Sequence, residues 1–156
     1  MIRDCVVKAL RSAVKVQDRQ RMSTLRLMMA AIKDRDITLR SNGTSDGVSD
    51  SELLDVFGCM VKQRREAVSV YEEAGRPDLA EREQAEVSVI SEFLPLQLEG
   101  DEMRTACEQI VMELGATSLK DMGRVMGALK KRYAGQIDFT VANTIVRSQL
   151  GEVVSS

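Results

Sequence analysis

The chain of 156 residues contains no histidine, and its 22 basic and 24 acidic side chains nearly cancel. Without histidine, neither a Ser-His-Asp nor a Cys-His catalytic centre can be built from it. No stretch approaches the ~20 consecutive apolar residues of a membrane span, and the first residues do not have the pattern of a secretory signal. The three cysteines form no CxxC motif, so we expect no metal site and a cytoplasmic protein.

Strong helix formers dominate the first half of the chain, with apolar residues at helical spacing. The pattern predicts helices over 2–16 and 18–40, followed by a polar loop over 41–48. A third helix opens with a capping box between Ser49 and Glu52.

Glycine and proline mark where the third helix ends and the fourth begins. We expect the third helix to stop at Gly75, because glycine suits a left-handed C-cap. Pro77 suits the first turn of a fourth helix, which ends near Pro95. Residues 95–100 are the best candidate for a linker.

Three shorter helices are predicted beyond that linker, over 101–114, 118–133 and 138–150. No segment shows the alternation of a strand. We therefore predict an all-α protein, with a four-helix N-terminal domain over 1–95 and a small three-helix domain over 96–156.

Charge is distributed unevenly along the chain. Residues 1–43 hold ten basic and four acidic side chains, residues 44–116 hold six and seventeen, and residues 117–151 hold six and two. Basic helices that pack beside acidic ones within the fold would explain this pattern. A polyanionic partner at the basic ends is the alternative.

One arginine and two glutamates interrupt the apolar faces of the third and fourth helices. Arg64 lies in the middle of one apolar face, and Glu83 and Glu86 lie on the other. A hairpin that turns at Gly75 brings them level, so we predict an ion pair of Arg64 with Glu86 or Glu83. A structural pair is favoured over an active-site carboxylate pair, because burying a single charge is costly. Cys59 lies on the polar side and lacks an activating base.

The segment 118–133 has two glycines on the face opposite its apolar stripe. Glycine within a helix costs roughly 1 kcal/mol relative to alanine. Basic side chains flank this bare backbone, which suits close approach of a phosphate backbone or of a partner helix. Packing on the N-terminal domain is the alternative. The predicted partner-binding residues are Lys120, Gly123, Arg124, Gly127, Lys131 and Gly135.

Several motifs together resemble the GatB/YqeY family. The resemblance covers nearly the whole chain and rests on Leu25-Arg26-Leu27, Lys62-Gln63-Arg64-Arg65, Ala74-Gly75-Arg76, Phe93-Leu94-Pro95, the run from Asp121 to Leu129, Gly135, Asp138 and Val141-Ala142-Asn143. The spacing of Gly127 and Gly135 is also similar to the tail domain of the GatB subunit of tRNA-dependent amidotransferases. Three residues depart from the pattern: Gln136 where a basic residue is usual, Ile137 where alanine is usual, and Phe139 where glycine is common.

The resemblance implies a non-catalytic helical adaptor that binds tRNA or is accessory to a tRNA-dependent amidotransferase. It also implies an alternative, a carbon–nitrogen ligase with glutamine as amido-N-donor. A protein–protein interaction module is a third possibility. No cofactor is indicated, because the chain has no glycine-rich nucleotide motif. The sequence does not decide the oligomeric state.

Overall fold

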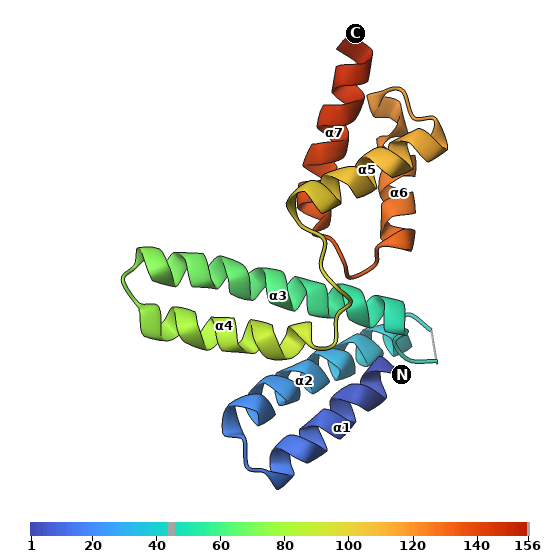
Figure 1. Cartoon of the computed structure of the whole chain (residues 1–156). Helices are drawn as coiled ribbons and strands as arrows, with labels where there is room; N and C mark the ends of the chain where they lie inside the picture. Colours follow the sequence, from blue (N-terminus) through green and yellow to red (C-terminus); the bar gives the residue numbers. More distant parts are fainter. Residues whose placement is uncertain (44–45, 156) are drawn as a thin grey trace. The chain divides into compact units, whose positions relative to one another are not determined.

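The computed structural model of the chain describes residues 1–43 and 46–155. These residues form seven α-helices and one short 3₁₀-helix, and contain no strand (Figure 1). The protein is therefore all-α, as the sequence predicts. The helices group into two compact units, Met1–Pro95 and Leu96–Ser156, and we describe each by itself.

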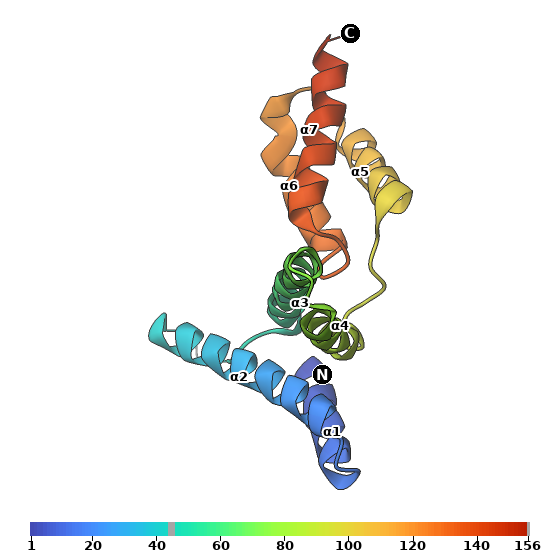
Figure 2. The same cartoon turned by 90° about the vertical axis from the view of Figure 1, so that its left-hand side faces the viewer.

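The first unit consists of two helical hairpins. Helices α1 (Ile2–Lys15) and α2 (Arg19–Ser41) form one, and α3 (Asp50–Glu73) and α4 (Pro77–Ser91) form the other. Helix α2 also packs against α4, so the two hairpins cross in the views of Figures 1 and 2.

Local signals at the ends of α3 and α4 agree with the sequence. Both hydrogen bonds of the capping box between Ser49 and Glu52 are present. Gly75 has a φ of 69°, the left-handed conformation of a helix C-cap. Pro77 occupies the first turn of α4, where its missing N–H leaves no intrahelical hydrogen bond unmade.

The core of the first unit draws on all four helices. Its buried members are Val6, Ala13, Leu25, Met28, Ile32, Leu53, Phe57, Val61, Val87 and Ile90. No residue from 62 to 86 belongs to this cluster. The turn end of the α3–α4 hairpin therefore projects beyond α1 and α2, as Figure 1 shows.

A buried carboxylate joins α1, α2 and the segment before α3, and it is not among the residues predicted from the sequence. Asp36 accepts hydrogen bonds from the guanidinium of Arg3 at 2.8 Å and from the backbone N–H of Val48 at 2.9 Å. The hydrogen bond from Arg3 is the main reason why the pKa of Asp36 lies below its usual range. These contacts hold the chain after α2 against both helices.

The second unit contains α5 (Gly100–Leu114), the 3₁₀-helix η1 (Leu119–Asp121), α6 (Met122–Arg132) and α7 (Phe139–Ser155). Both α5 and α6 pack against α7. The buried side chains at its centre are Met103, Cys107, Ile110, Ala116, Val125, Leu129, Ile137, Ala142, Val146 and Leu150.

The predicted single helix over 118–133 begins differently in the structure. A capping box between Ser118 and Asp121 closes a 3₁₀ turn first, and α6 starts only at Met122. Gly123 therefore lies in the first turn of α6, where glycine costs less than at mid-helix, and only Gly127 is a glycine of the helix interior.

Helix α7 runs to Ser155, past the predicted end at residue 150. Gly151 follows that predicted end, but glycine lowers helix stability without ending a helix unless it adopts a positive φ. Gly151 is not among the glycines with positive φ. None of the helices in the described ranges is long and apolar enough to cross a membrane.

Candidate nucleic-acid interface

The sequence singles out five residues on one face of the 118–133 segment, which we call the α6 face. All five are exposed: Lys120 of η1, and Gly123, Arg124, Gly127 and Lys131 of α6. The core side of α6 buries Val125 and Leu129 instead, as the apolar stripe predicts. The glycine face is therefore part of the accessible surface.

The two glycines of α6 have no structural need to be glycine. Neither has a positive φ, and a Cβ atom added at Gly123 or Gly127 would meet no atom within 4 Å. The same is true of Gly58 in α3, so the absence of a contact does not by itself assign a function. What distinguishes the α6 pair is its setting.

That setting is a shallow groove between α6 and α7. Residues with i, i+4 spacing line both sides, including Gly123 with Gly127 on α6 and Phe139 with Asn143 on α7. Its complete lining is Gly123, Met126, Gly127, Lys130, Phe139, Thr140, Asn143 and Thr144. Bare helix backbone thus forms part of one wall, and aromatic and amide groups contribute to the other.

The basic residue that lines the groove is Lys130, which is not among the residues predicted from the sequence. Its ammonium lies 5.8 Å from the centroid of the Phe139 ring, a cation–π contact. Lys130 is seven residues after Gly123, two helical turns along the same side, so helical spacing could have indicated it. The participation of Phe139 and Asn143 could not be read from α6 alone, because it depends on how α7 packs.

The other basic side chains of α6 differ in how far they are already engaged. Arg132 makes two hydrogen bonds to Glu113 of α5, at 2.8 and 3.1 Å. Arg124 donates one at 3.1 Å to Asp121. The pKa of Asp121 is lowered, chiefly by a hydrogen bond from the backbone N–H of Thr117.

Lys120 of η1 and Lys131 of α6 do not line the groove, and together we call them the basic rim. Both are exposed, and neither makes an ion pair with any described residue. Their charges are therefore available to a partner at little desolvation cost.

Gly135 has a structural role at the turn after α6. It is buried, and its φ of 74° lies in the left-handed region. Its carbonyl accepts a hydrogen bond from the side-chain amide of Gln97. We predicted Gly135 to be a partner-binding residue, but a buried glycine offers no side chain or surface to a partner, so it does not belong to the exposed face.

Arg64 and Glu86 form an ion pair across the α3–α4 hairpin. The Nε–Oε2 distance is 2.7 Å, and each side chain is 15% exposed. Arg64 also donates to the carbonyl of Met60 at 3.1 Å. Glu83, the other candidate partner, is half-buried on α4. The pair joins α3 to α4 on the turn side of the core residues Val61 and Val87.

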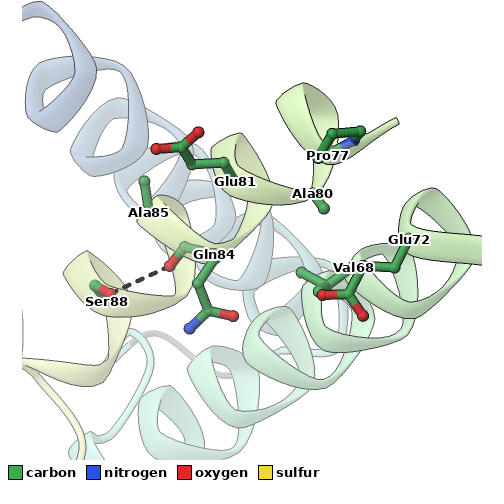
Figure 3. Close-up of a pocket in the computed structure, with 8 residues that line it drawn as sticks. All are labelled: Val68, Glu72, Pro77, Ala80, Glu81, Gln84, Ala85 and Ser88. Carbon is green, nitrogen blue, oxygen red and sulfur yellow. Dashed lines mark hydrogen bonds between the residues drawn. The ribbon is translucent and has the colours of Figure 1, made fainter. Parts of the chain in front are cut away.

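A second concave surface lies on the projecting part of the α3–α4 hairpin. Figure 3 shows that Val68 and Glu72 of α3 line it opposite a row of α4 residues. Those α4 residues are Pro77, Ala80, Glu81, Gln84, Ala85 and Ser88. The hydroxyl of Ser88 already donates to the carbonyl of Gln84 at 3.2 Å. This surface is open to solvent and only weakly polar. Its lining residues form no cluster of groups that would perform chemistry.

The cysteines and carboxylates suggest no reactive centre within the described ranges. Cys5 and Cys59 are exposed, whereas Cys107 is buried, and burial raises the pKa of its thiol. The described residues contain no group of three or more histidine, cysteine or acidic side chains that could hold a metal ion.

Comparison with known protein families covers both units. The sequence profile of the family described as "Yqey-like protein" matches residues 3–150, which is nearly the whole chain. The chain belongs to the YqeY-like family. The matched range includes the Arg64–Glu86 pair and the entire α6–α7 groove, so both features lie within the family domain.

Relatives of this YqeY-like chain include fungal proteins named "Altered inheritance of mitochondria protein 41, mitochondrial". The protein from Eremothecium gossypii is 28% identical over 111 residues, which cover 69% of this chain and 58% of the relative. Those from Lachancea thermotolerans and Saccharomyces cerevisiae (strain S288c) are each 26% identical, over 56% and 54% of this chain and 44% of the relative. The chain thus spans about half the length of the curated relatives it matches.

Proposed function

We propose that this YqeY-like chain is a non-catalytic helical adaptor that binds RNA, with tRNA as the expected partner, through the exposed α6 face. The observation that carries the proposal is the combination of two lysines that pair with no described residue, Lys120 and Lys131, with a groove that glycine leaves open. A polyanion gains from both features, because its phosphates meet the ammonium groups and its backbone approaches the helix closely.

The charge of the surrounding segment supports a polyanion over an acidic or neutral partner. Residues 117–151 hold six basic and two acidic side chains, a net charge of +4. Only part of this charge is satisfied internally, by the contacts of Arg124 and Arg132. The remainder supplies the salt-dependent attraction that dominates non-specific binding of nucleic acid.

The expected process is tRNA-dependent amidation, in which the chain would be accessory to an amidotransferase. This part of the proposal rests on the sequence-based expectation that the spacing of Gly127 and Gly135 resembles the GatB tail domain. We further propose that Met1–Pro95 and Leu96–Ser156 are separate domains and that the second binds RNA. A cytoplasmic location stays a prediction, since the fungal relatives are mitochondrial by name.

Carbon–nitrogen ligase activity with glutamine as the amido donor is the alternative function. We expect the purified protein to release no ammonia from glutamine above background, because it lacks histidine and its exposed Cys59 has no activating base. Coupled detection of ammonia measures this. Release that disappears in a point variant would place the enzyme ahead of the adaptor.

Salt-dependent RNA binding tests the proposal. Titration of labelled tRNA should show that Lys131→Glu weakens binding and lowers the slope of log K against log salt by about one unit, as expected for one lost phosphate contact. Lys8→Glu, at an exposed lysine of α1, is the matched control with the same change in net charge. It should leave the slope unchanged.

Two results would count against RNA as the partner. The first is no detectable tRNA binding by the wild type at low salt. The second is an equal loss in Lys8→Glu and Lys131→Glu, which would show that net charge alone attracts RNA. In either case a partner helix becomes the better explanation of the glycine groove, because small residues also allow helices to pack closely.

A further inference from the structure

We infer that the α6–α7 groove receives an unpaired nucleobase, so that the RNA bound by this face is single-stranded where it meets the groove. This inference rests on the proposed RNA binding and adds to it the class of RNA segment. It depends on two residues of α7, Phe139 and Asn143, which do not belong to the basic rim.

The open side of the groove has room for a planar ring. The positions where Gly123 and Gly127 would carry a Cβ atom are empty to 4 Å. An alanine at either position would place a methyl group in that space. A flat base can therefore approach the α6 backbone at a place that no described side chain occupies.

The groove offers both contacts by which proteins hold an unstacked base. The ring of Phe139 provides an aromatic surface, and base–aromatic stacking tolerates any base. The amide of Asn143, one helical turn further along α7, is half-buried, and the described residues give it no hydrogen-bond partner. An amide offers donors and an acceptor, which match the edge of a base.

The contact of Lys130 with the Phe139 ring can be replaced by a base when RNA binds. The Lys130 ammonium now lies 5.8 Å from the Phe139 centroid. Such a contact at an exposed site is weak, and a phosphate attracts the ammonium more strongly. The lysine therefore moves to the RNA backbone, and the exposed face of the ring becomes available to the base.

A base within an RNA duplex cannot make these contacts with Phe139 and Asn143. In an RNA duplex, stacking covers the faces of the bases, and the deep major groove hides most of their edges from side chains. Phosphate contacts with Lys120 and Lys131 remain possible with either form of RNA. The rim thus supplies general affinity, and the groove supplies preference for an unpaired nucleotide.

Short labelled RNAs of equal phosphate number separate the two contributions. The full-length protein is titrated with a single strand, the same strand carrying abasic sites, and a blunt duplex. We expect the wild type to bind the intact strand about tenfold more tightly than the abasic strand, the scale of one stacked base. Asn143→Ala and Phe139→Leu should each reduce this preference several-fold while abasic-strand affinity stays the same.

Val141→Ala, at an exposed position of α7 outside the groove, is the control and should keep the full preference. Asn143→Ala removes no core side chain, so it remains informative if Phe139→Leu unfolds the domain. Equal affinity of the wild type for intact and abasic strands overturns the inference but leaves the proposed function standing. Failure to bind any of the three RNAs overturns both.

Discussion

The α3–α4 hairpin and the α6 helix each contain residues that an amphipathic helix should avoid, but the fold accounts for only one set. On the hairpin, Arg64 and Glu86 interrupt apolar faces and satisfy each other at 2.7 Å. On α6, Gly127 and Lys131 are exposed, and no described residue packs on the glycine or pairs with the lysine. Arg64 and Glu86 are thus explained by the fold. Gly127 is not, and its place in the α6–α7 groove, which Gly58 does not share, points to a partner.

Removing Arg64 should cause the largest change in stability. Arg64→Ala leaves Glu86 partly buried without its partner, and we expect the unfolding free energy to fall by about 2–3 kcal/mol, between the values for exposed and fully buried pairs. Urea denaturation followed by circular dichroism measures this. The double variant Arg64→Met/Glu86→Leu should lose less than the sum of the single variants. A stability equal to that of the wild type in Arg64→Ala would show that the pair is not structural.

Gly135→Ala should destabilise the second unit by about 1–2 kcal/mol. The φ of 74° at this buried turn is unfavourable for any residue with a Cβ atom. Thermal unfolding measures the change. An increase in stability would mean that the turn tolerates alanine, and the structural role of Gly135 would then have to be given up.

Gly127→Ala separates α6 from the α3–α4 hairpin most clearly, because it should gain stability and lose RNA binding. Gly127→Ala adds helix propensity where no atom obstructs a methyl group, so we expect a gain of about 0.5–1 kcal/mol. Gly58→Ala, in the interior of α3, should gain a similar amount. Only Gly127→Ala should weaken RNA binding. A loss of stability in Gly127→Ala would indicate that α6 does use this glycine within the fold.

The smallest effect is expected at the Asp36 contact, and it depends on pH. Because the folded-state pKa of Asp36 is lowered, chiefly by Arg3, its contribution is present above the unfolded-state pKa of about 3.9 and is lost as pH falls through the folded value. In the wild type, the unfolding free energy therefore falls as the pH drops below about 4. Asp36→Asn should make this fall less steep. An unchanged acid profile would show that other carboxylates control acid unfolding.

The sequence predicts most of the fold because its signals are local. Caps at Ser49 and Gly75 and the position of Pro77 locate α3 and α4. The hairpin that turns at Gly75 then brings Arg64 level with Glu86. The start of α6 was predicted wrongly because a 3₁₀ turn and an α-helix share the same capping residues at Ser118.

The candidate site is less predictable, because its walls come from two helices. Helical spacing places Gly123 and Gly127 on one face, but the groove between α6 and α7 lies toward Lys130 rather than Lys131. No pattern within α6 indicates that Phe139 and Asn143 complete it. Contact between helices separated by a turn is a property of packing, which a single sequence does not specify.

The affinity of Gly127→Leu for tRNA tests the central claim most directly. The variant fills the open space on α6 with a side chain, without removing any charge or any contact of the fold. We predict an unchanged helical spectrum, a melting temperature no lower than that of the wild type, and clearly weaker tRNA binding. Binding equal to the wild type, with the fold intact, would contradict the claim that this groove exists for an RNA partner.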